Sequence, residues 1–387
     1  MKRLASMLLA GAILLTGCGG AKTDSAKSGG LVAVTLASIS PLSGPAAAQG
    51  ESIRFGAELA VKDKAAELEK AGYKVSFLAM DDQDKPEQGT QLAEQLITKK
   101  EVLGVVGTLS SGVAIPVSQK LSADNIVIVS PANTATQVTD RGLPNMNRIV
   151  ARDDAQGPAA AKFIAEKLKA TSLFIIHDKT PFGQGLAEEV RKAAGAMGMK
   201  VDAFEGITRG EKDYSAVLSK LKTVGSPVIY YGGVYAEASQ MLKQMKEKAV
   251  SAAFVSGDGI DSAELVRLAG DASNGVYFTS VVADISKTAD GQAFAKRYTE
   301  LAKKDLDSYS AYAYDCGLII INALIEYGKA NPGKAPSRKE LAEAVRKTSG
   351  YKGIAGTHTF DAKGDDKEAK VFIYQFQNGK YPGTLIQ

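Results

Sequence analysis

Short apolar runs alternate along this chain with longer stretches in which an apolar residue recurs every three or four positions. In the first half, the short runs cover residues 31–37, 74–80, 102–106 and 126–129. They are mostly continuous in Val, Ile and Leu, as is typical of parallel strands covered on both faces. The longer stretches predict helices over residues 49–69 and 86–99. Repeated strand-and-helix order therefore predicts an α/β unit.

The same pattern starts again near Gln156. It predicts strands over residues 172–177, 200–205, 227–231 and 252–256, alternating with helices over 158–169, 184–197, 215–223 and 236–248. A second α/β unit of similar build is the simplest account. The rest of the chain predicts helices over 291–303 and 309–327, a third from Ser337, and a hairpin of residues 356–360 and 371–377 around the turn 361–365.

The first 30 residues have a composition of their own. Two basic residues precede an apolar run over residues 4–15, which ends in Leu15-Thr16-Gly17-Cys18. This order is typical of a lipoprotein signal, so we expect residues 1–17 to be removed and Cys18 to carry the lipid. A plain secretory signal with a chance cysteine is the alternative. The run is shorter than the roughly 20 residues that span a bilayer, and residues 18–30 have the composition of a flexible tether.

Composition limits the functions open to the chain. Its 387 residues are enough for two domains of ordinary size. The formal net charge is only +4, and no run of Lys or Arg is dense enough to follow the phosphates of a nucleic acid. Because one of the 2 cysteines is assigned to the lipid, Cys316 has no disulfide partner within the chain. We therefore expect no nucleic-acid partner and no internal disulfide.

Two loops in the first half are rich in hydroxyls. Residues 107–112, Gly-Thr-Leu-Ser-Ser-Gly, follow one predicted strand, and residues 130–134, Ser-Pro-Ala-Asn-Thr, follow the next. The carboxyl ends of parallel strands form the usual ligand edge of an open sheet. Hydroxyls and free backbone N–H groups near helix starts hold a carboxylate without any buried cation. N-capping of the helices is the alternative use of these residues.

A single carboxylate complements these loops. Asp258 stands between two glycines directly after a predicted strand of the second unit, so it would lie at the matching sheet edge. A turn between glycines accounts for it equally well. One carboxylate that faces a cluster of neutral donors suits a zwitterion, and an α-amino acid has that charge pattern.

The sequence offers little for a catalytic or metal site. Its 2 histidines, His177 and His358, belong to no nucleophile or metal-ligand spacing, and His177 is interpreted as a hydrogen-bonding residue at a strand end. Residues 182–185, Phe-Gly-Gln-Gly, lack the third glycine of a dinucleotide fingerprint. The acidic residues 81–84 are interpreted as a solvated helix start rather than a cation site. We therefore predict a protein that is not an enzyme and uses no metal or cofactor.

At these residues the chain resembles the leucine/isoleucine/valine-binding proteins of bacterial branched-chain amino acid ABC transporters. The similarity runs from about Leu31 to the C-terminus, and the densest matches are Pro41-Leu42-Ser43-Gly44-Pro45, Ser130-Pro131-Ala132-Asn133-Thr134, Ile175-Ile176-His177-Asp178-Lys179, residues 206–215 and Tyr230-Tyr231-Gly232-Gly233. The resemblance implies an α/β fold of the type I periplasmic binding protein kind, with two Rossmann-like lobes joined by a three-crossing hinge. It implies an N-terminal lobe of residues 31–150 and 283–355, and a C-terminal lobe of residues 151–282 and 356–387.

The resemblance also implies a set of ligand contacts. Ser111 and Thr134, with the backbone of Ala132 and Thr134, would bind the ligand α-carboxylate. Asp258 stands where the family has an acidic partner for the ammonium, usually one methylene longer, and Phe182 stands where an aromatic residue covers the ligand. Gln49 replaces an aromatic residue and Val234 replaces a tyrosine. Asn133 and Tyr235 complete the expected contacts, while Asp84 and Ser110 occupy the positions of a disulfide that this chain lacks.

Together these features predict a lipid-anchored solute-binding protein outside the cytoplasm, on the cell membrane or in the periplasm. It is expected to capture a branched-chain or other small amino acid between two lobes and to deliver it to the permease subunits of an ABC transporter. The alternative is a ligand-sensing lipoprotein for a small zwitterion or amide that is not coupled to transport, because the same pocket would serve both functions.

Overall fold

A computed structural model describes residues 30–387, and the expected signal peptide, Cys18 and most of the expected tether lie outside the described residues. The strands are β1 (Val32–Ser40), β2 (Tyr73–Asp81), β3 (Val102–Gly107), β4 (Val127–Ser130), β5 (Met146–Arg148), β6 (Ser172–His177), β7 (Lys200–Gly206), β8 (Val228–Gly232), β9 (Ala253–Ser256), β10 (Tyr277–Ser280), β11 (Tyr351–Lys352), β12 (Thr357–His358), β13 (Phe372–Gln377) and β14 (Lys380–Leu385). The α-helices are α1 (Ala47–Lys70), α2 (Pro86–Thr98), α3 (Ser111–Ser122), α4 (Gln137–Asp140), α5 (Asp153–Glu166), α6 (Pro181–Ala196), α7 (Ser215–Val224), α8 (Tyr235–Glu247), α9 (Ala263–Ala269), α10 (Ala289–Ala302), α11 (Ser310–Ala330) and α12 (Arg338–Arg346). Short 3₁₀ turns lie at Asp258–Ile260, Gly270–Ser273 and Ile285–Lys287.

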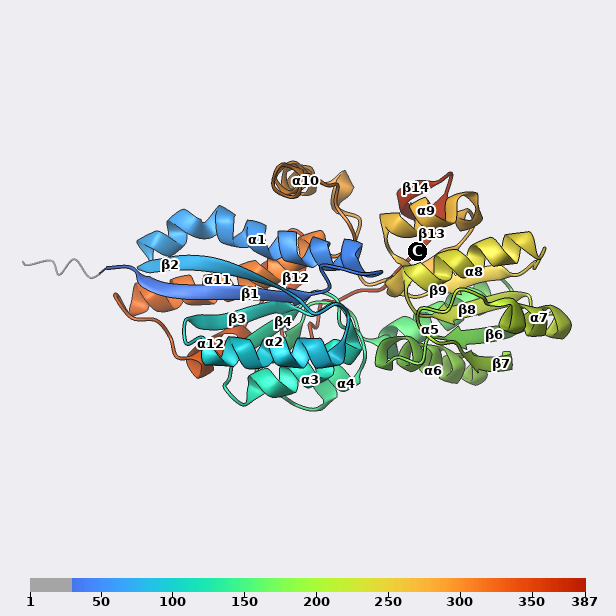
Figure 1. The fold of residues 1–387 in the computed structure, drawn as a ribbon, viewed down its shortest axis with the longest axis horizontal. Helices are drawn as coiled ribbons and strands as arrows, with labels where there is room; N and C mark the ends of the chain where they lie inside the picture. Colours follow the sequence, from blue (N-terminus) through green and yellow to red (C-terminus); the bar gives the residue numbers. More distant parts are fainter. Residues whose placement is uncertain (1–29) are drawn as a thin grey trace, which may run out of the picture. The chain divides into compact units, whose positions relative to one another are not determined.

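The first lobe is built on a parallel five-stranded sheet of order β2-β1-β3-β4-β5 (Figure 1). Alternate strand residues enter two different cores, one shared with α1 and α11 and the other with α2 and α3. Because both faces are covered, β3 and β4 are buried at every position. The burial of both strands confirms the prediction that these continuous apolar runs are central strands of a parallel sheet.

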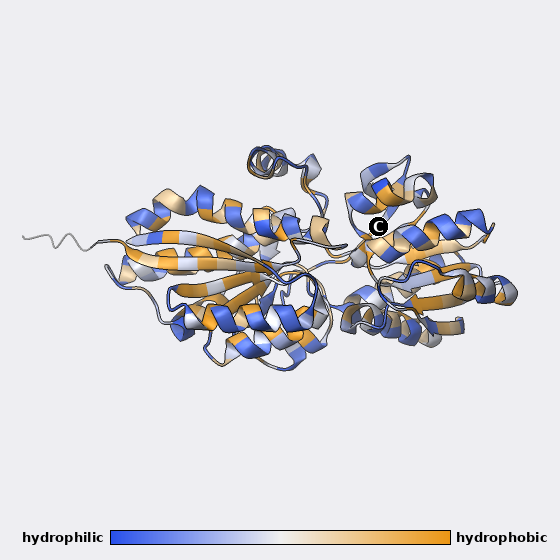
Figure 2. Cartoon of the chain, in the orientation of Figure 1, coloured by the Kyte–Doolittle hydropathy of each residue, from blue (hydrophilic) through white to orange (hydrophobic). Residues whose placement is uncertain are grey.

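The second lobe is built on a seven-stranded sheet of order β14-β13-β10-β9-β8-β6-β7. Strands β6 to β10 run parallel, whereas β13 pairs antiparallel with β10, and β14 pairs antiparallel with β13. One face packs on α5 and α6 and the other on α7, α8 and α9. Figure 2 shows the result as hydrophobic strands between helices whose outer faces are hydrophilic.

The late helices return to the first lobe. α11 packs along α1, and the two helices approach closely at small residues. A Cβ added to Gly56 would lie 2.2 Å from the backbone oxygen of Ser310, and one added to Gly317 would lie 2.8 Å from the Cβ of Ala60. These glycines therefore allow α11 to cover the first sheet after the chain has already built most of the second.

The predicted hairpin of residues 356–360 and 371–377 is wrong. β12 pairs with β11, whereas β13 pairs with β14 across the turn Asn378-Gly379. The segment before β13 stays with the first lobe, because Phe360 lies in that lobe's core and Asp365 contacts Arg148 at the end of β5. The chain therefore joins the second sheet only at Phe372, later than the expected Gly356.

Within residues 30–387, no helix combines the length and the hydropathy needed to cross a membrane.

Candidate functional site

A cavity of about 30 Å³ lies between the two lobes. In the first lobe the lining comes from the loops after β2, β3 and β4 and from the N-terminal ends of α1 and α11. In the second lobe it comes from the loops after β6, β7, β8 and β9 and from the first turn of α6. The lining residues are Ala46, Gln49, Asp84, Leu109, Ser110, Ala132, Asp178, Thr180, Phe182, Arg209, Val234, Asp258, Gly259 and Tyr309. This volume holds no more than a few water molecules. A ligand of amino-acid size therefore requires the contacts across the cavity to open.

Five of the predicted site residues line this cavity, namely Gln49, Ala132, Phe182, Val234 and Asp258. Four do not. Ser111 and Thr134 are buried close behind the lining, Asn133 is fully buried, and Tyr235 packs in the core of the second lobe. The structure thus brings the two expected halves of the site together but leaves these four side chains outside the cavity wall.

Asn133 joins the two hydroxyl-rich loops. Its Oδ1 accepts hydrogen bonds from the Ser130 hydroxyl at 2.7 Å and the Thr108 backbone N–H at 3.2 Å, and its Nδ2 donates to the Leu109 carbonyl at 2.8 Å. With its amide occupied in this way, Asn133 positions the loops rather than presenting its side chain to a ligand. Beside it, the Ser111 hydroxyl accepts from the Ala135 N–H at 3.3 Å, and the Thr134 hydroxyl has no partner among the described residues.

A buried cation supports the same loop from behind, contrary to the expectation of neutral donors alone. Arg148, at the end of β5, is fully buried and donates from Nη1 to the carbonyls of Asn133 and Ala135, both at 2.9 Å. Its Nε lies 2.6 Å from Asp365 Oδ1. The backbone around Thr134 is therefore fixed by a charge-assisted network. No local pattern marks Arg148, because the carboxylate that pairs with it, Asp365, comes from a distant part of the sequence.

Asp258 presents the carboxylate of the second lobe. It lies in the 3₁₀ turn after β9, where Oδ1 accepts from Gln156 Nε2 and Oδ2 accepts from the Tyr309 hydroxyl, both at 2.9 Å. Burial raises the pKa of Asp258 to about 6, although both hydrogen bonds act to lower it. Each carboxylate oxygen has a second lone pair, so Asp258 can also accept hydrogen bonds from a ligand ammonium.

The glycines around Asp258 have a steric role. A Cβ added to Gly259 would lie 2.3 Å from the Gly233 carbonyl oxygen and 2.7 Å from the Phe182 ring. One added to Gly257 would lie 2.4 Å from a Leu186 methyl group. The two glycines thus let the turn approach α6 closely enough to place Asp258 beside Phe182.

A second charged group, separate from Asp258, also lines the cavity. Arg209, in the loop after β7, reaches the first lobe with Nη2 2.6 Å from Asp84 Oδ2, and its Nε stands 3.9 Å from Asp178 Oδ2. Burial acts to lower the pKa of Arg209, but the charges of Asp84 and Asp178 outweigh it and raise that pKa. The prediction of a solvated helix start is wrong for two of the three acidic residues there: Asp82 is fully buried, with its pKa raised by burial to about 7, and Asp84 pairs with Arg209, whereas Asp81 is partly exposed.

Three polar contacts join the lobes across the cavity. They are the Tyr309–Asp258 hydrogen bond, the Arg209–Asp84 ion pair, and a hydrogen bond of 3.2 Å from Gln49 Nε2 to the Asp261 carbonyl. Sequence reasoning missed Tyr309 and gave Arg209 and Asp178 no role, although the last two lie within motifs that carry the resemblance. Their pairing depends on the two lobes meeting, which no local pattern specifies.

The histidines take structural positions. His177 Nδ1 accepts from the Lys179 N–H at 3.2 Å, so His177 is the strand-end hydrogen-bonding residue that was predicted. His358 lies between Asp315 and Asp366 in the first lobe, away from the cavity. Among residues 30–387, no group of His, Cys, Asp and Glu side chains is arranged to hold a metal ion.

A larger cavity of about 410 Å³ lies elsewhere between the lobes, lined by residues such as Phe278, Leu306, Tyr312 and Tyr381. It includes none of the predicted site residues. The smaller cavity is therefore the candidate site, because five of the predicted site residues line it and it lies at loops from the carboxyl ends of both sheets.

Two α/β lobes that face each other with a carboxylate and neutral donors between them define a two-lobed receptor for a small solute. Comparison with known proteins agrees. The sequence profile of the periplasmic binding protein family matches residues 33–380. Leu/Ile/Val-binding protein homolog 1 of Brucella suis biovar 1 (strain 1330) is 35% identical over 339 residues, which cover 88% of this chain and 89% of that protein.

Two further proteins are similar over nearly the whole chain. An amino acid binding protein of Pseudomonas aeruginosa is 33% identical over 354 residues, covering 91% of this chain and 92% of that protein. The crystal structure of the leucine binding protein LivK from Thermotoga maritima MSB8 superposes with a TM-score of 0.81 at 25% identity, covering 90% of this chain and 96% of that one. The chain belongs to the periplasmic binding protein family and has its type I fold. It is a solute-binding protein of that family, not an enzyme, and the family implies a location outside the cytoplasm.

Proposed function

We propose that this protein captures an amino acid between its lobes by the two charged groups that all α-amino acids share. The α-carboxylate would bind at the loops after β3 and β4, to the backbone of Ala132 and Thr134 and the hydroxyls of Ser111 and Thr134. The α-ammonium would bind Asp258. The observation that carries the proposal is a buried carboxylate of one lobe that lines the same cavity as Ala132 of the other.

Ligand binding would favour the closed form, because the two ends of the ligand contact different lobes. A ligand shifts an equilibrium only toward the state that it binds better, and only closed lobes place Asp258 opposite the loop of Ala132. The side chains of Ser111 and Thr134 are buried and do not line the present cavity. Small movements of Ser111 and Thr134 would accompany ligand entry as the cavity widens.

The proposal also covers how the protein is attached to a membrane and where it delivers its ligand. Cys18 would carry the lipid anchor, residues 18–30 would form the tether, and the loaded protein would pass its ligand to the permease subunits of an ABC transporter. The names of its relatives support the amino-acid ligand of this proposal, since they include Leu/Ile/Val-binding proteins and an amino acid binding protein. Replacing Cys18 with Ser should release the protein from membranes or leave an uncut precursor, without changing ligand affinity.

Thermal unfolding in the presence of each of the twenty amino acids tests the binding function. A ligand that binds only the folded protein stabilises it by about 2.7 kcal/mol at a hundred times its dissociation constant. We expect a clear rise in melting temperature with at least one amino acid and none with its decarboxylated amine. If no amino acid raises the melting temperature, the proposed function is wrong.

A further inference from the structure

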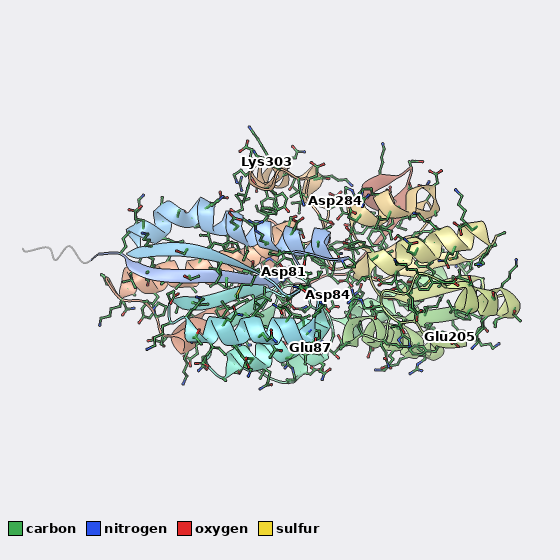
Figure 3. All side chains as sticks on the ribbon, viewed as in Figure 1. Asp81, Asp84, Glu87, Glu205, Asp284 and Lys303 are labelled. Carbon is green, nitrogen blue, oxygen red and sulfur yellow. The ribbon has the colours of Figure 1, made fainter. Side chains whose placement is uncertain are left out.

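Three charged side chains line the cavity as one cluster, because Arg209 pairs with Asp84 and its Nε stands 3.9 Å from Asp178 Oδ2. Asp84 comes from the loop between β2 and α2, Asp178 from the loop after β6, and Arg209 from the loop after β7. Figure 3 labels Asp84 where that loop leaves the first sheet. We call Asp84 and Asp178 the acidic end of the cavity. Asp258 also lines the cavity, so the acidic end is part of the site that would hold an amino acid.

Both carboxylates of the acidic end keep an oxygen without a hydrogen-bond partner among the described residues. Asp178 is only 3% exposed, and its Oδ1 accepts from the Thr180 N–H and hydroxyl at 3.0 and 2.6 Å, yet its buried Oδ2 accepts none. Asp84 Oδ2 pairs with Arg209, while its buried Oδ1 has no partner. Buried polar atoms are normally paired, so two such oxygens at a ligand cavity mark positions for donors from outside the chain.

The charge at this end is not balanced within the protein. One guanidinium, that of Arg209, stands against the carboxylates of Asp84 and Asp178, and the nearby buried Glu237 adds a further negative charge to its surroundings. Glu237 Oε1 accepts from the Gly210 N–H at 2.9 Å, and its Oε2 has no partner. A ligand that brings N–H donors or positive charge would neutralise this excess, whereas an acidic side chain would add to it.

The remaining walls suit a side chain with an apolar stem. Phe182 and Val234 line the cavity with apolar surface, and Gln49 lies in the place of an aromatic residue that the resemblance would predict. Long side chains commonly pack an apolar stem and keep a polar end where it finds partners. The cavity offers both surfaces. A wholly aliphatic side chain would instead bury the unpartnered oxygens of Asp84 and Asp178 without satisfying them.

We propose that the preferred ligand is an amino acid whose side chain ends in N–H donors, that is an ammonium, a guanidinium or a carboxamide, in preference to Leu, Ile or Val. The inference rests on the proposed function, in which Asp258 and the first-lobe loops hold the α-groups. Asp84 and Asp178 then accept hydrogen bonds from the end of the side chain, and they set the specificity of the site.

Calorimetric titration of the purified protein tests separately whether it binds an amino acid and whether it prefers a side chain that ends in N–H donors. The panel contains lysine, ornithine, arginine, glutamine and asparagine, together with leucine, glutamate and alanine. At least one of the first five should bind ten times more tightly than leucine, and glutamate should bind more weakly than glutamine. Tighter binding of leucine or glutamate overturns the specificity inference but leaves the proposed function standing, whereas an absence of binding by the whole panel overturns both.

Conservative variants test whether Asp84 and Asp178 bind the side chain of the ligand. Asp84→Asn keeps the shape of the side chain and removes its charge, and Asp178→Asn does the same on the other lobe. Each should weaken the preferred donor-ended amino acid at least fivefold relative to alanine, whose side chain has no N–H donor to offer the acidic end. The ratio of two affinities is the readout because the Asp84–Arg209 pair also joins the lobes, and any effect on closure acts on both ligands alike. Equal weakening of both ligands in the two variants would mean that the charges serve closure alone.

Discussion

Among single residues, Asp258 should contribute most to ligand affinity. It would bind the ammonium of the ligand through its charge, whereas Thr134 would bind the carboxylate through a neutral hydroxyl. Asp258→Asn would leave a desolvated ammonium without its counter-charge, and losing one partner of a buried charge pair costs about 2–5 kcal/mol of binding free energy. Thr134→Val removes one hydroxyl while the backbone N–H remains, for which about 1.5–3 kcal/mol is expected. Titration of both variants with the same amino acid should show Asp258→Asn as the weaker binder. Affinity within about twofold of the parent would place the ammonium elsewhere.

The same residue predicts how affinity changes with pH. The pKa of Asp258 in the ligand-free protein is raised by burial to about 6. Below that value the carboxyl becomes neutral, so the dissociation constant should rise between pH 7 and pH 5, by up to about tenfold for each pH unit below the pKa. Asp153, whose pKa is raised by burial and by the Asp258 charge to about 8, is already mostly protonated over that range.

Asp258→Asn is the control for this pH series. Its weaker binding should vary little between pH 7 and pH 5, because the group that titrates has been removed. The buried Asp261 and Asp307, with pKa values raised by burial to about 7 and about 6, titrate in the same interval. If the affinity of the variant depends on pH as that of the parent does, the titrating group is Asp261 or Asp307 and not Asp258.

At the scale of elements, Arg148 connects β5 to the loop that follows β4. Arg148→Met fills a similar volume but leaves the Asn133 carbonyl without its donor and removes one of the groups paired with Asp365, which keeps Arg152 and Thr139. A buried acceptor left unsatisfied costs about 1–3 kcal/mol, so denaturant unfolding should show a loss of stability of that order and titration a weaker ligand. Arg267→Met is the matched control, since its pair with Glu264 is exposed and contributes about 0–1 kcal/mol.

His358 ties the segment after β12 to α11. Burial acts to lower its pKa, but hydrogen bonds to Asp315 and Asp366 outweigh burial and raise the pKa to about 9. A folded-state pKa above the unfolded value of about 6.5 stabilises the fold fully below pH 6.5, and this stabilisation disappears as pH rises through 9. The difference in melting temperature between the parent and His358→Gln should therefore be largest near pH 6 and shrink toward pH 9.5. A constant difference would show that the ring matters only for packing.

The sequence predicts long buried strands well and short strands poorly, and the reason is physical. Strand β6 was predicted with its observed bounds because a buried parallel strand consists of one short apolar run. The two-residue strands β11 and β12 have no such run, since their pairing depends on the tight turn between Lys352 and Thr357. The same limit applies to the site. Asp258 and Phe182 were predicted from their motifs, whereas Tyr309 and Arg209 reach the cavity only when the lobes meet.

For the whole molecule, the contacts across the cavity determine how easily the lobes separate. The Tyr309 hydroxyl bonds Asp258 of the other lobe. Tyr309→Phe should therefore shift the ligand-free protein toward open forms, with a larger radius of gyration in solution scattering, and should weaken amino-acid binding by about 1.5–3 kcal/mol. Tyr73→Phe, which removes a hydroxyl bonded to the Lys334 carbonyl within the first lobe, should change neither quantity. Equal radii for the two variants would exclude Tyr309 from control of closure.

The path of the chain between the lobes also decides when each core can form during synthesis. The first sheet is made early, but α11 and α12, which cover one of its faces, follow the five parallel strands of the second sheet. The second sheet in turn receives β13 and β14 last. Neither lobe is complete until the ribosome has nearly finished, although domains usually fold one after another as they emerge. A chain of this topology therefore leaves the ribosome before either lobe is fully folded, and an incompletely folded chain is the form that can pass through a secretion channel.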